Sequence, residues 1–205
     1  MLSHPNKLPP FYITPLRSRQ DALACAALQG EAYIDAYRER DTPPGQPITD
    51  FVRWSGFLPR KSGYLTCSAD RELGTHVVRH RAPHGQRPIV GFCIGSQYPG
   101  NPAEVHLDAV FMNIGFRRYG LASCLLRSLS SDYPQCQIMR TETTQGTAAV
   151  RFFEQLGFVA TNKYIPPPPE PYAWNGTNLP QVEMVAELKE LETLTTAYWA
   201  AATCS

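Results

Sequence analysis

A histidine and an aspartate stand two residues apart, at His106 and Asp108, inside the strand-like segment 104–112. Residues two apart on a β-strand face the same side, about 6.5–7 Å apart along the chain. An imidazole has a reference pKa of about 6.5, and a nearby carboxylate raises it, so the pair suits a general base at neutral pH. A strand histidine beside an aspartate is more often a structural hydrogen-bonded pair, and the two residues alone leave both interpretations open.

The same segment leads into a basic turn, Arg117-Arg-Tyr-Gly120-Leu-Ala122, which opens a predicted helix. The first N–H groups of a helix have no partner within it, and the helix dipole is positive at this end, so anions bind there. Gly120 and Ala122 let the backbone approach a ligand closely, and Arg117 and Arg118 add positive charge. The turn therefore predicts a phosphate or pyrophosphate site, although a basic helix start on a surface loop is also common.

The elements that must position these residues alternate along the chain. Strand patterns occupy residues 11–16, 76–80, 89–94, 104–112, 137–141, 158–160 and 181–188, and helix patterns occupy 21–37, 48–58, 147–156, 187–201 and the segment between Gly120 and Pro134. The second and third strands flank a turn with Pro and Gly, which predicts a hairpin. This order predicts an α/β or α+β fold with a mixed sheet.

Composition limits the classes of protein. The chain has 205 residues, and we expect one domain over 1–205. Hydrophobic residues make up 43% and charged residues 18%, which is typical of a globular protein. The formal net charge is +1, without the basic surplus that a nucleic-acid binder needs. With no apolar run near the ~18 residues of a membrane span and no signal peptide, we expect a cytoplasmic protein without nucleic-acid or membrane partners.

The six cysteines are scattered, and none forms a C-x-x-C pair or has a histidine at metal-ligand spacing. We therefore expect no metal site and no cysteine nucleophile. Cys93 and Cys124 have apolar neighbours and are expected in the core. His76, His80 and His84 are expected on the surface of the hairpin.

Two motifs resemble the GNAT (Gcn5-related N-acetyltransferase) superfamily. The turn Arg117 to Ala122 matches the family pattern R/Q-x-x-G-x-G/A after a strand, and Ala149-Val-Arg-Phe-Phe-Glu-Gln-Leu-Gly157-Phe158 resembles the second motif helix, which ends in Gly-Phe. The resemblance covers about residues 89–158, with 181–188 as the final strand, and the domain would end in a C-terminal strand and helix over 181–201. It implies a mixed, mostly antiparallel central sheet flanked by helices.

The resemblance also implies acetyl-CoA as the co-substrate. Its pyrophosphate would rest on the N–H groups of 118–122 and its pantetheine arm along the strand edge at 110–112, with a backbone N–H near Val110 or Phe111 polarising the thioester carbonyl. The cofactor-binding residues implied are Val110, Phe111, Met112, Arg117, Arg118, Tyr119, Gly120, Leu121, Ala122, Ser123 and Phe153.

The catalytic residues follow from the same comparison. His106 and Asp108 align with two histidines of the arylalkylamine N-acetyltransferases, so His106 is the expected general base and Asp108 its partner, with Glu104 the next candidate. Where many relatives have a tyrosine that protonates the thiolate, this chain has Phe153. Tyr164 or Tyr172 would then supply the hydroxyl, or water would.

We expect transfer of acetyl from acetyl-CoA to a primary amine on a small molecule, by direct attack in a ternary complex. The expected acceptor-binding residues are the aromatics Tyr33, Tyr37, Trp54, Tyr172 and Trp174. The alternatives are acetylation of a protein lysine or N-terminus, and a catalytically silent acyl-CoA-binding regulator. The sequence leaves monomer and homodimer open.

Overall fold

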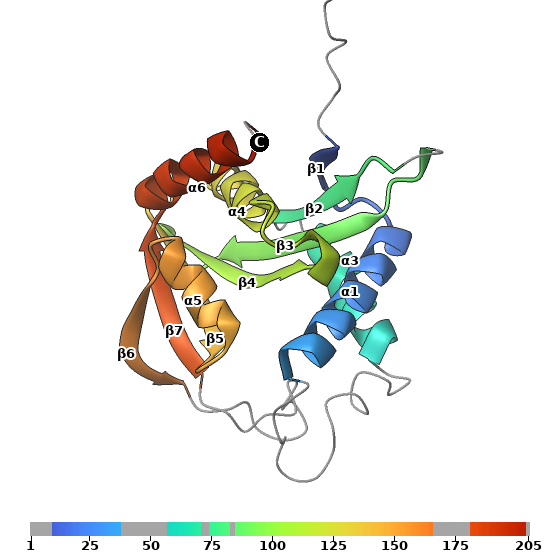
Figure 1. Cartoon of the computed structure of the whole chain (residues 1–205). Coiled ribbons are helices and arrows are strands. Elements are labelled where there is room, and N and C mark those ends of the chain that lie inside the picture. Colours follow the sequence, from blue (N-terminus) through green and yellow to red (C-terminus); the bar gives the residue numbers. More distant parts are fainter. Residues whose placement is uncertain (1–9, 38–56, 71–73, 83–84, 166–180, 204–205) are drawn as a thin grey trace, which may run out of the picture.

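A seven-stranded sheet forms the centre of the protein in the computed structural model, which describes residues 10–37, 57–70, 74–82, 85–165 and 181–203 (Figure 1). The strands are β1 (Phe11–Pro15), β2 (Gly74–His80), β3 (Ile89–Gln97), β4 (Glu104–Met112), β5 (Ile138–Thr144), β6 (Val159–Ile165) and β7 (Gln181–Glu187). The helices are α1 (Arg19–Tyr37), α3 (Phe57–Asp70), the 3-10 turn η2 (Ile114–Phe116), α4 (Leu121–Asp132), α5 (Ala148–Gln155) and α6 (Leu188–Thr203).

The strands lie in the order β1-β2-β3-β4-β5-β7-β6. Every neighbouring pair is antiparallel except β4 and β5, which are parallel and are joined through α4. A parallel pair needs such a crossover because its two strands run in the same direction. The predicted fold class, a mixed and mostly antiparallel sheet flanked by helices, is confirmed.

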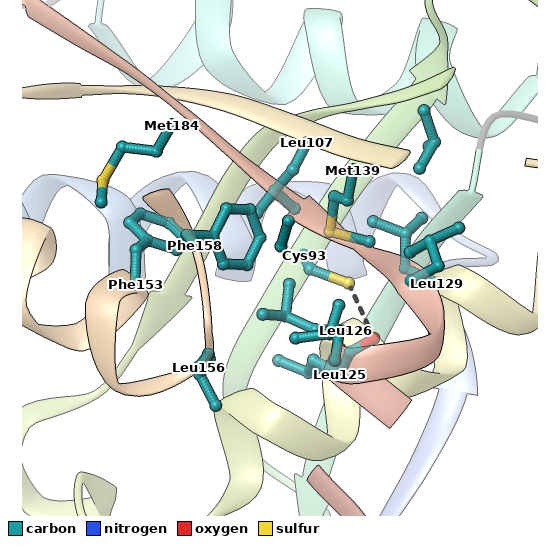
Figure 2. Close-up of a cluster of buried hydrophobic side chains, with 14 of the residues drawn as sticks. Cys93, Leu107, Leu125, Leu126, Leu129, Met139, Phe153, Leu156, Phe158 and Met184 are labelled. Atoms are coloured by element: carbon teal, nitrogen blue, oxygen red, sulfur yellow. Dashed lines mark hydrogen bonds between the residues drawn. The ribbon is translucent and has the colours of Figure 1, made fainter. Parts of the chain in front are cut away.

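One face of the sheet packs against α4, α5 and α6 in the larger core (Figure 2). The helical stripe of Leu121, Leu125 and Leu129 is buried against strand residues such as Leu107, as its spacing predicts. Burying a leucine side chain contributes about 1.5–3 kcal/mol, so this stripe fixes α4 firmly on the sheet. The N-terminus of α4 is thereby held beside the end of β4.

The opposite face of the sheet is covered by α1 and α3, which pack on β2, β3 and β4. Small residues of α1, among them Ala22, Cys25 and Ala26, lie fully buried there against Phe92 and Ile94 of β3. The absence of bulky side chains on this side of α1 lets the helix approach the strands closely. On the same face, β4, β5 and β7 carry charged side chains at Glu104, Arg140 and Glu183 instead.

Several predicted elements need correction. The helix predicted at 48–58 lies outside the described residues except for Phe57 and Leu58, which begin α3, and no helix was predicted over the rest of α3. Pro59 and Gly63 lie inside α3. Because both residues are poor helix formers, the sequence does not indicate a helix there. The strands β5 and β6 run further than predicted, to Thr144 and Ile165.

Three side chains also differ in burial from the predictions. His76, expected on the hairpin surface, is 8% exposed, and its Nε2 lies 2.7 Å from Oδ2 of Asp132 at the end of α4. Its neighbour His80 is half-buried against Phe11, and His84 lies outside the described residues. Cys93 is buried as predicted, whereas Cys124 is only half-buried.

Candidate active site

The predicted pair on β4 is formed: Nδ1 of His106 lies 2.9 Å from Oδ1 of Asp108. A β-bulge explains how the two side chains meet. Ile94 of β3 pairs with Ala109, and Gly95 pairs with Leu107, so Asp108 is an extra residue on β4. Bulges re-aim side chains and are frequent beside active sites. The bulge also lets Oδ2 of Asp108 accept a hydrogen bond from Ser96 Oγ at 3.3 Å.

The environment of His106 favours its protonated form. The hydrogen bond to Asp108 raises the pKa of His106 above its ordinary value, and the charges of Asp108 and Glu142 act in the same direction. Burial and the charge of Arg140 oppose this shift. An Asp108 carboxylate that accepts the proton on Nδ1 leaves the Nε2 lone pair of neutral His106 free to accept another proton.

The pairing of β4 with β5 ends beside this pair. It runs from Glu104 with Ile138 to Leu107 with Thr141, although β4 continues to Met112. Throughout 108–112, β4 stays paired with β3 on its other side, apart from the bulge. Within the described part of the chain, the β5-facing edge of β4 therefore presents peptide groups without a strand partner, and such an edge can accept an extended ligand.

The basic turn has an unusual backbone. Arg118 has φ of 69°, in the left-handed region that rarely holds a residue other than glycine, and Gly120 has φ of 72°. Gly120 also precedes the first turn of α4 and, having no side chain, provides no capping hydrogen bond. Left-handed residues that lead into an uncapped helix N-terminus turn several N–H groups toward one point, which favours an anion.

A model of the Acetyltransferase (GNAT) family matches residues 32–158 of this sequence. This match covers more than half of the chain and both of the motifs described above. The chain belongs to the GNAT acetyltransferase family.

Solved structures agree with the fold of this GNAT protein. The PaiA N-acetyltransferase of Thermoplasma acidophilum, crystallised with coenzyme A, aligns with a TM-score of 0.63 at 10% identity over 86% of this chain and 98% of its own. YncA of Salmonella typhimurium, crystallised with acetyl-CoA, aligns with a TM-score of 0.56 at 15% identity over 87% of this chain and 94% of its own. The ribosomal-protein-S18-alanine N-acetyltransferase of Escherichia coli aligns with a TM-score of 0.52 at 16% identity over 86% of this chain and 93% of its own. A comparison with curated protein sequences gives no match.

GNAT acetyltransferases use acetyl-CoA, so membership confirms the cofactor predicted from the sequence. Among the side chains that the structure describes, no group of three or more His, Cys, Asp or Glu could hold a metal ion. None of the described helices is long and apolar enough to cross a membrane.

The residues expected to hold the cofactor fall into two groups. The first comprises the strand edge at 110–112 and the backbone of 117–123, which the fold brings to the end of β4 and the start of α4. Within it, the side chains of Leu121 and Ser123 are buried, so only their backbone could meet a ligand, and Tyr119 is 55% exposed. The second is Phe153 alone, whose ring is 4% exposed and packs 5.0 Å from Phe158 in the core.

Arg117 contacts α1: its Nη1 lies 2.6 Å from Oδ2 of Asp35, and its Nε donates to the carbonyl of Met112 at 3.4 Å. Aromatic packing supports the rest of the turn. Phe116 and Tyr119 contact Phe11 of β1 at ring distances of 5.9 and 6.0 Å. The turn is thus held on both sides before any ligand arrives.

The remaining predicted site residues are placed unevenly. Glu104 is buried, and its carboxylate is bound by Arg140, so it is less available as a base than His106. Tyr33 of α1 packs edge-on against Phe111 at 5.4 Å, beside β4. Tyr37 ends α1 and Tyr164 lies in β6, but their side chains are outside the described part, as are all of Trp54, Tyr172 and Trp174.

Three residues near His106 were missed in the sequence analysis. Ser96 contacts Asp108, Tyr98 lies with its ring 6.1 Å from the imidazole, and Arg140 is the Cα partner of His106 across β4 and β5. No local pattern marks them, because strand register decides which residues meet. Once β3 and β4 are recognised as a hairpin, counting back from the turn would have pointed to Ser96.

Proposed function

We propose that this protein is an N-acetyltransferase that transfers acetyl from acetyl-CoA to a primary amine on a small molecule, by direct attack in a ternary complex. The observation that carries the proposal is the His106–Asp108 pair, 2.9 Å between Nδ1 and Oδ1, on β4 immediately before the part of its edge that has no described strand partner. The proposed proton acceptor and the strand edge proposed to bind the cofactor thus belong to the same strand, β4.

The described residues fit the cofactor. The left-handed turn at Arg118 and Gly120, followed by an α4 N-terminus that no side chain caps, suits a pyrophosphate. The β4 edge at 110–112 suits an extended arm with amide groups, because its N–H and C=O groups can pair with them. An N–H of Val110 or Phe111 would donate to the thioester carbonyl, where negative charge develops.

His106 would deprotonate the attacking amine. An alkylammonium has a reference pKa of about 10.4 and has no lone pair until it loses a proton. Asp108 holds the proton on Nδ1, so Nε2 of His106 accepts the amine's proton during attack. Bound acetyl-CoA supplies an acetyl group activated as a thioester. A thiol has a reference pKa of about 8.5, so the thiolate can leave without a dedicated acid, which accommodates a phenylalanine at position 153.

The acceptor would bind on the α1 side of β4, because His106 faces that side. Tyr33, packed on Phe111, is the described aromatic residue nearest to this position among those predicted to form the acceptor wall. Peptide acceptors are the competing class, since one structural neighbour is named as an alanine N-acetyltransferase of ribosomal protein S18.

Thiol release from acetyl-CoA, measured with small aromatic and aliphatic amines, polyamines and peptides, tests the proposal. We expect turnover with a small amine, and a loss of about 10²–10⁴-fold in kcat for His106→Ala with coenzyme A binding retained. His76→Ala is the matched control, because it removes a second His–Asp pair, which lies beside α4. Turnover of peptides alone would transfer the proposal to protein acetylation, and binding of acetyl-CoA without any turnover would favour the regulatory alternative.

A further inference from the structure

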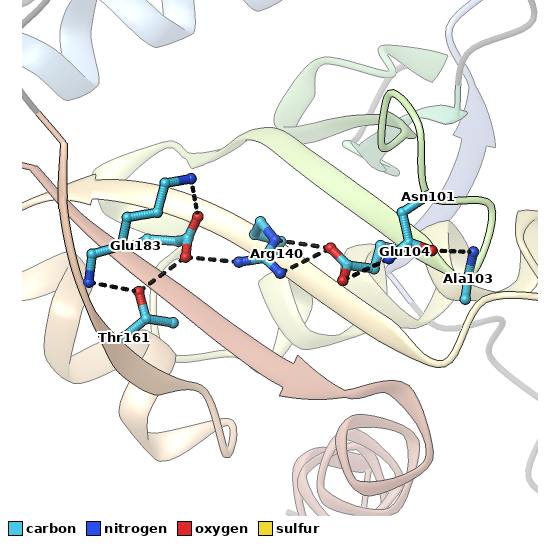
Figure 3. Close-up of polar contacts among 7 residues, drawn as sticks. Asn101, Ala103, Glu104, Arg140, Thr161 and Glu183 are labelled. Atoms are coloured by element: carbon cyan, nitrogen blue, oxygen red, sulfur yellow. Dashed lines mark hydrogen bonds and ion pairs between the residues drawn. The ribbon is translucent and has the colours of Figure 1, made fainter.

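A chain of charged side chains crosses the sheet from β6 to β4 on the face that carries His106 (Figure 3). Lys163 Nζ lies 2.9 Å from Glu183, whose other oxygen lies 2.7 Å from Arg140 Nη1. On the far side, Nε and Nη2 of Arg140 each lie 2.9 Å from Oε2 of Glu104. Asn101 donates to the remaining oxygen of Glu104 at 2.9 Å. Arg140 is thus fixed from two sides.

The chain of charges is largely buried. The side chain of Glu183 is 2% exposed, that of Glu104 11% and that of Arg140 18%. Burial alone raises the pKa of Glu183, but the hydrogen bonds from Lys163 and Thr161, with the charges of Arg140 and Lys163, lower it below its ordinary value. Glu183 is therefore ionised at neutral pH and holds Arg140 in one place.

Arg140 lies beside the candidate base. It is the Cα partner of His106 in the parallel β4–β5 pair, so both side chains project from the same face. The ring of Tyr98 lies close to both side chains. Arg140 Cζ lies 5.4 Å from the centroid of this ring, and the centroid of the His106 imidazole lies 6.1 Å from it. A guanidinium within about 6 Å of a ring centroid is attracted to the ring.

We propose that Arg140 is a positioning residue for His106: anchored by Glu104 and Glu183, it holds Tyr98 against the imidazole and sets a positive charge that favours the neutral, proton-accepting form of His106. The inference rests on the proposed role of His106 as the base. It assigns a function to a buried ion-pair chain that would otherwise be structural.

The charge of Arg140 matters because the other groups near His106 favour the opposite state. Asp108 on β4 and Glu142 on β5 both favour the imidazolium, which cannot accept a proton from an amine. The carboxylate of Glu104, also on β4, is held in an ion pair by Arg140. Among the described groups that influence the charge of His106, Arg140 is the cation that opposes the two carboxylates.

The test compares two double variants, each of which removes one positive and one negative side chain from this chain of charged residues. Arg140→Met with Glu183→Gln removes the cation beside His106 and avoids leaving Glu183 ionised without it. Lys163→Met with Glu183→Gln removes one cation and one anion as well, but leaves Arg140 beside His106. Titration of His106 by two-dimensional NMR, with the signal assigned through His106→Gln, measures the imidazole directly in the full chain.

We expect the first double variant to titrate at higher pH than wild type, and the Lys163 double variant to titrate as wild type does. Arg140→Lys keeps the charge and is expected to titrate closer to wild type than the first double variant. Equal titration of His106 in both double variants would overturn the inference and leave Arg140 structural. If the first double variant does not fold, the triple variant Glu104→Gln, Arg140→Gln, Glu183→Gln replaces it, with the same expected direction.

The pH dependence of kcat separates this inference from the proposed function. If His106 is the base, the acidic limb of kcat moves with the NMR midpoint in each variant. A shifted NMR midpoint with an unshifted limb would keep the inference about Arg140 and remove His106 as the base. An unshifted NMR midpoint in the first double variant would overturn the inference about Arg140, and a limb that shifts without the midpoint would also assign the limb to a group other than His106.

Discussion

Arg117 Nη1 and Asp35 Oδ2 lie 2.6 Å apart and join the turn before α4 to the last part of α1. From its place in the motif turn, Arg117 is expected to contribute positive charge to the cofactor site. Its guanidinium also donates to Met112, so it fixes the geometry of the turn as well. The side of the sheet expected to bind the acceptor and the turn expected to bind coenzyme A are therefore connected through one ion pair.

The strength of this connection can be measured. Both side chains are partly exposed, 40% for Arg117 and 30% for Asp35, and exposed pairs contribute about 0.2–1 kcal/mol. A double-mutant cycle with Arg117→Ala and Asp35→Ala, followed by urea unfolding, should give a coupling in this range. Arg117→Ala should weaken coenzyme A binding by less than about tenfold, or 1.4 kcal/mol. A larger loss by calorimetry would show that the guanidinium itself contacts the cofactor.

Gly120→Glu should abolish the stabilisation of the protein by coenzyme A. The substitution adds a negative side chain at the N-terminus of α4, where the pyrophosphate is expected, and strains a left-handed residue. Gly100→Glu is the matched control, because Gly100 has φ of 80° in the turn between β3 and β4, and a Cβ added there would meet no other atom within 4 Å among the described residues. Unchanged coenzyme A affinity in a folded Gly120→Glu variant would move the cofactor site elsewhere.

The pH dependence of kcat follows from the His106–Asp108 bond. Because this bond raises the pKa of His106, the base becomes neutral, and kcat rises, at a pH above the ordinary value for histidine. Asp108→Asn removes the charge and should move the acidic limb of kcat to lower pH while reducing kcat at its plateau. Ser96→Ala serves as a milder comparison, since it removes a hydrogen bond to Asp108 and keeps the Asp108 carboxylate that pairs with His106. A limb that stays in place in Asp108→Asn would contradict a catalytic role for the pair.

The sequence predicted the fold where a local pattern determines it. The stripe of Leu121, Leu125 and Leu129 sets both the length of α4 and its buried face, and the motif turn lies where its glycine allows a left-handed residue. The His106–Asp108 pair was also predicted, because a spacing of two places both residues on one side of a strand, but the two side chains meet at the bulge at Asp108, which regular alternation does not predict.

Contacts that depend on register could not be predicted. The bulge at Asp108 shifts the pairing of β3 with β4, and nothing in the sequence marks it. Arg140 meets Glu104 and Glu183 only because β5 lies between β4 and β7, an order that the sequence does not specify. His76 was misplaced for a related reason: its partner, Asp132, lies 56 residues away in sequence.

The burial of Phe153 predicts the result of restoring the family's tyrosine. The resemblance implies that a tyrosine hydroxyl at this position helps the leaving thiolate, and on that ground alone Phe153→Tyr would raise kcat or leave it unchanged. The ring lies in the core, 5.1 Å from Phe152 and 5.0 Å from Phe158, where a new hydroxyl would be buried. A buried hydroxyl without a partner costs about 1–3 kcal/mol, so we now expect Tm to fall by about 2–12 °C.

Phe152→Tyr is the control for this substitution, because Phe152 is only half-buried on the same helix and should tolerate a hydroxyl with little change in Tm. Thermal unfolding and kcat are measured on both variants. An unchanged Tm with a higher kcat for Phe153→Tyr would instead show that the hydroxyl reaches the reacting thioester.

Two buried threonines should respond in opposite ways to replacement by valine. Thr75 in β2 is 4% exposed, and its Oγ1 has no hydrogen-bond partner within the described structure. Thr141 in β5 is 3% exposed, and its Oγ1 donates to the carbonyl of Leu107 at 3.0 Å, at the last paired residues of β4 and β5.

Valine has nearly the shape of threonine and an equally good strand propensity, so the substitution isolates the hydroxyl. Thr75→Val should stabilise the protein by about 1 kcal/mol or more, because it removes an unsatisfied buried group. Thr141→Val should destabilise it by about 1 kcal/mol, because it removes a hydrogen bond. Urea unfolding of both variants measures the two changes, and equal signs would show that Thr75 has a partner among the residues outside the described structure.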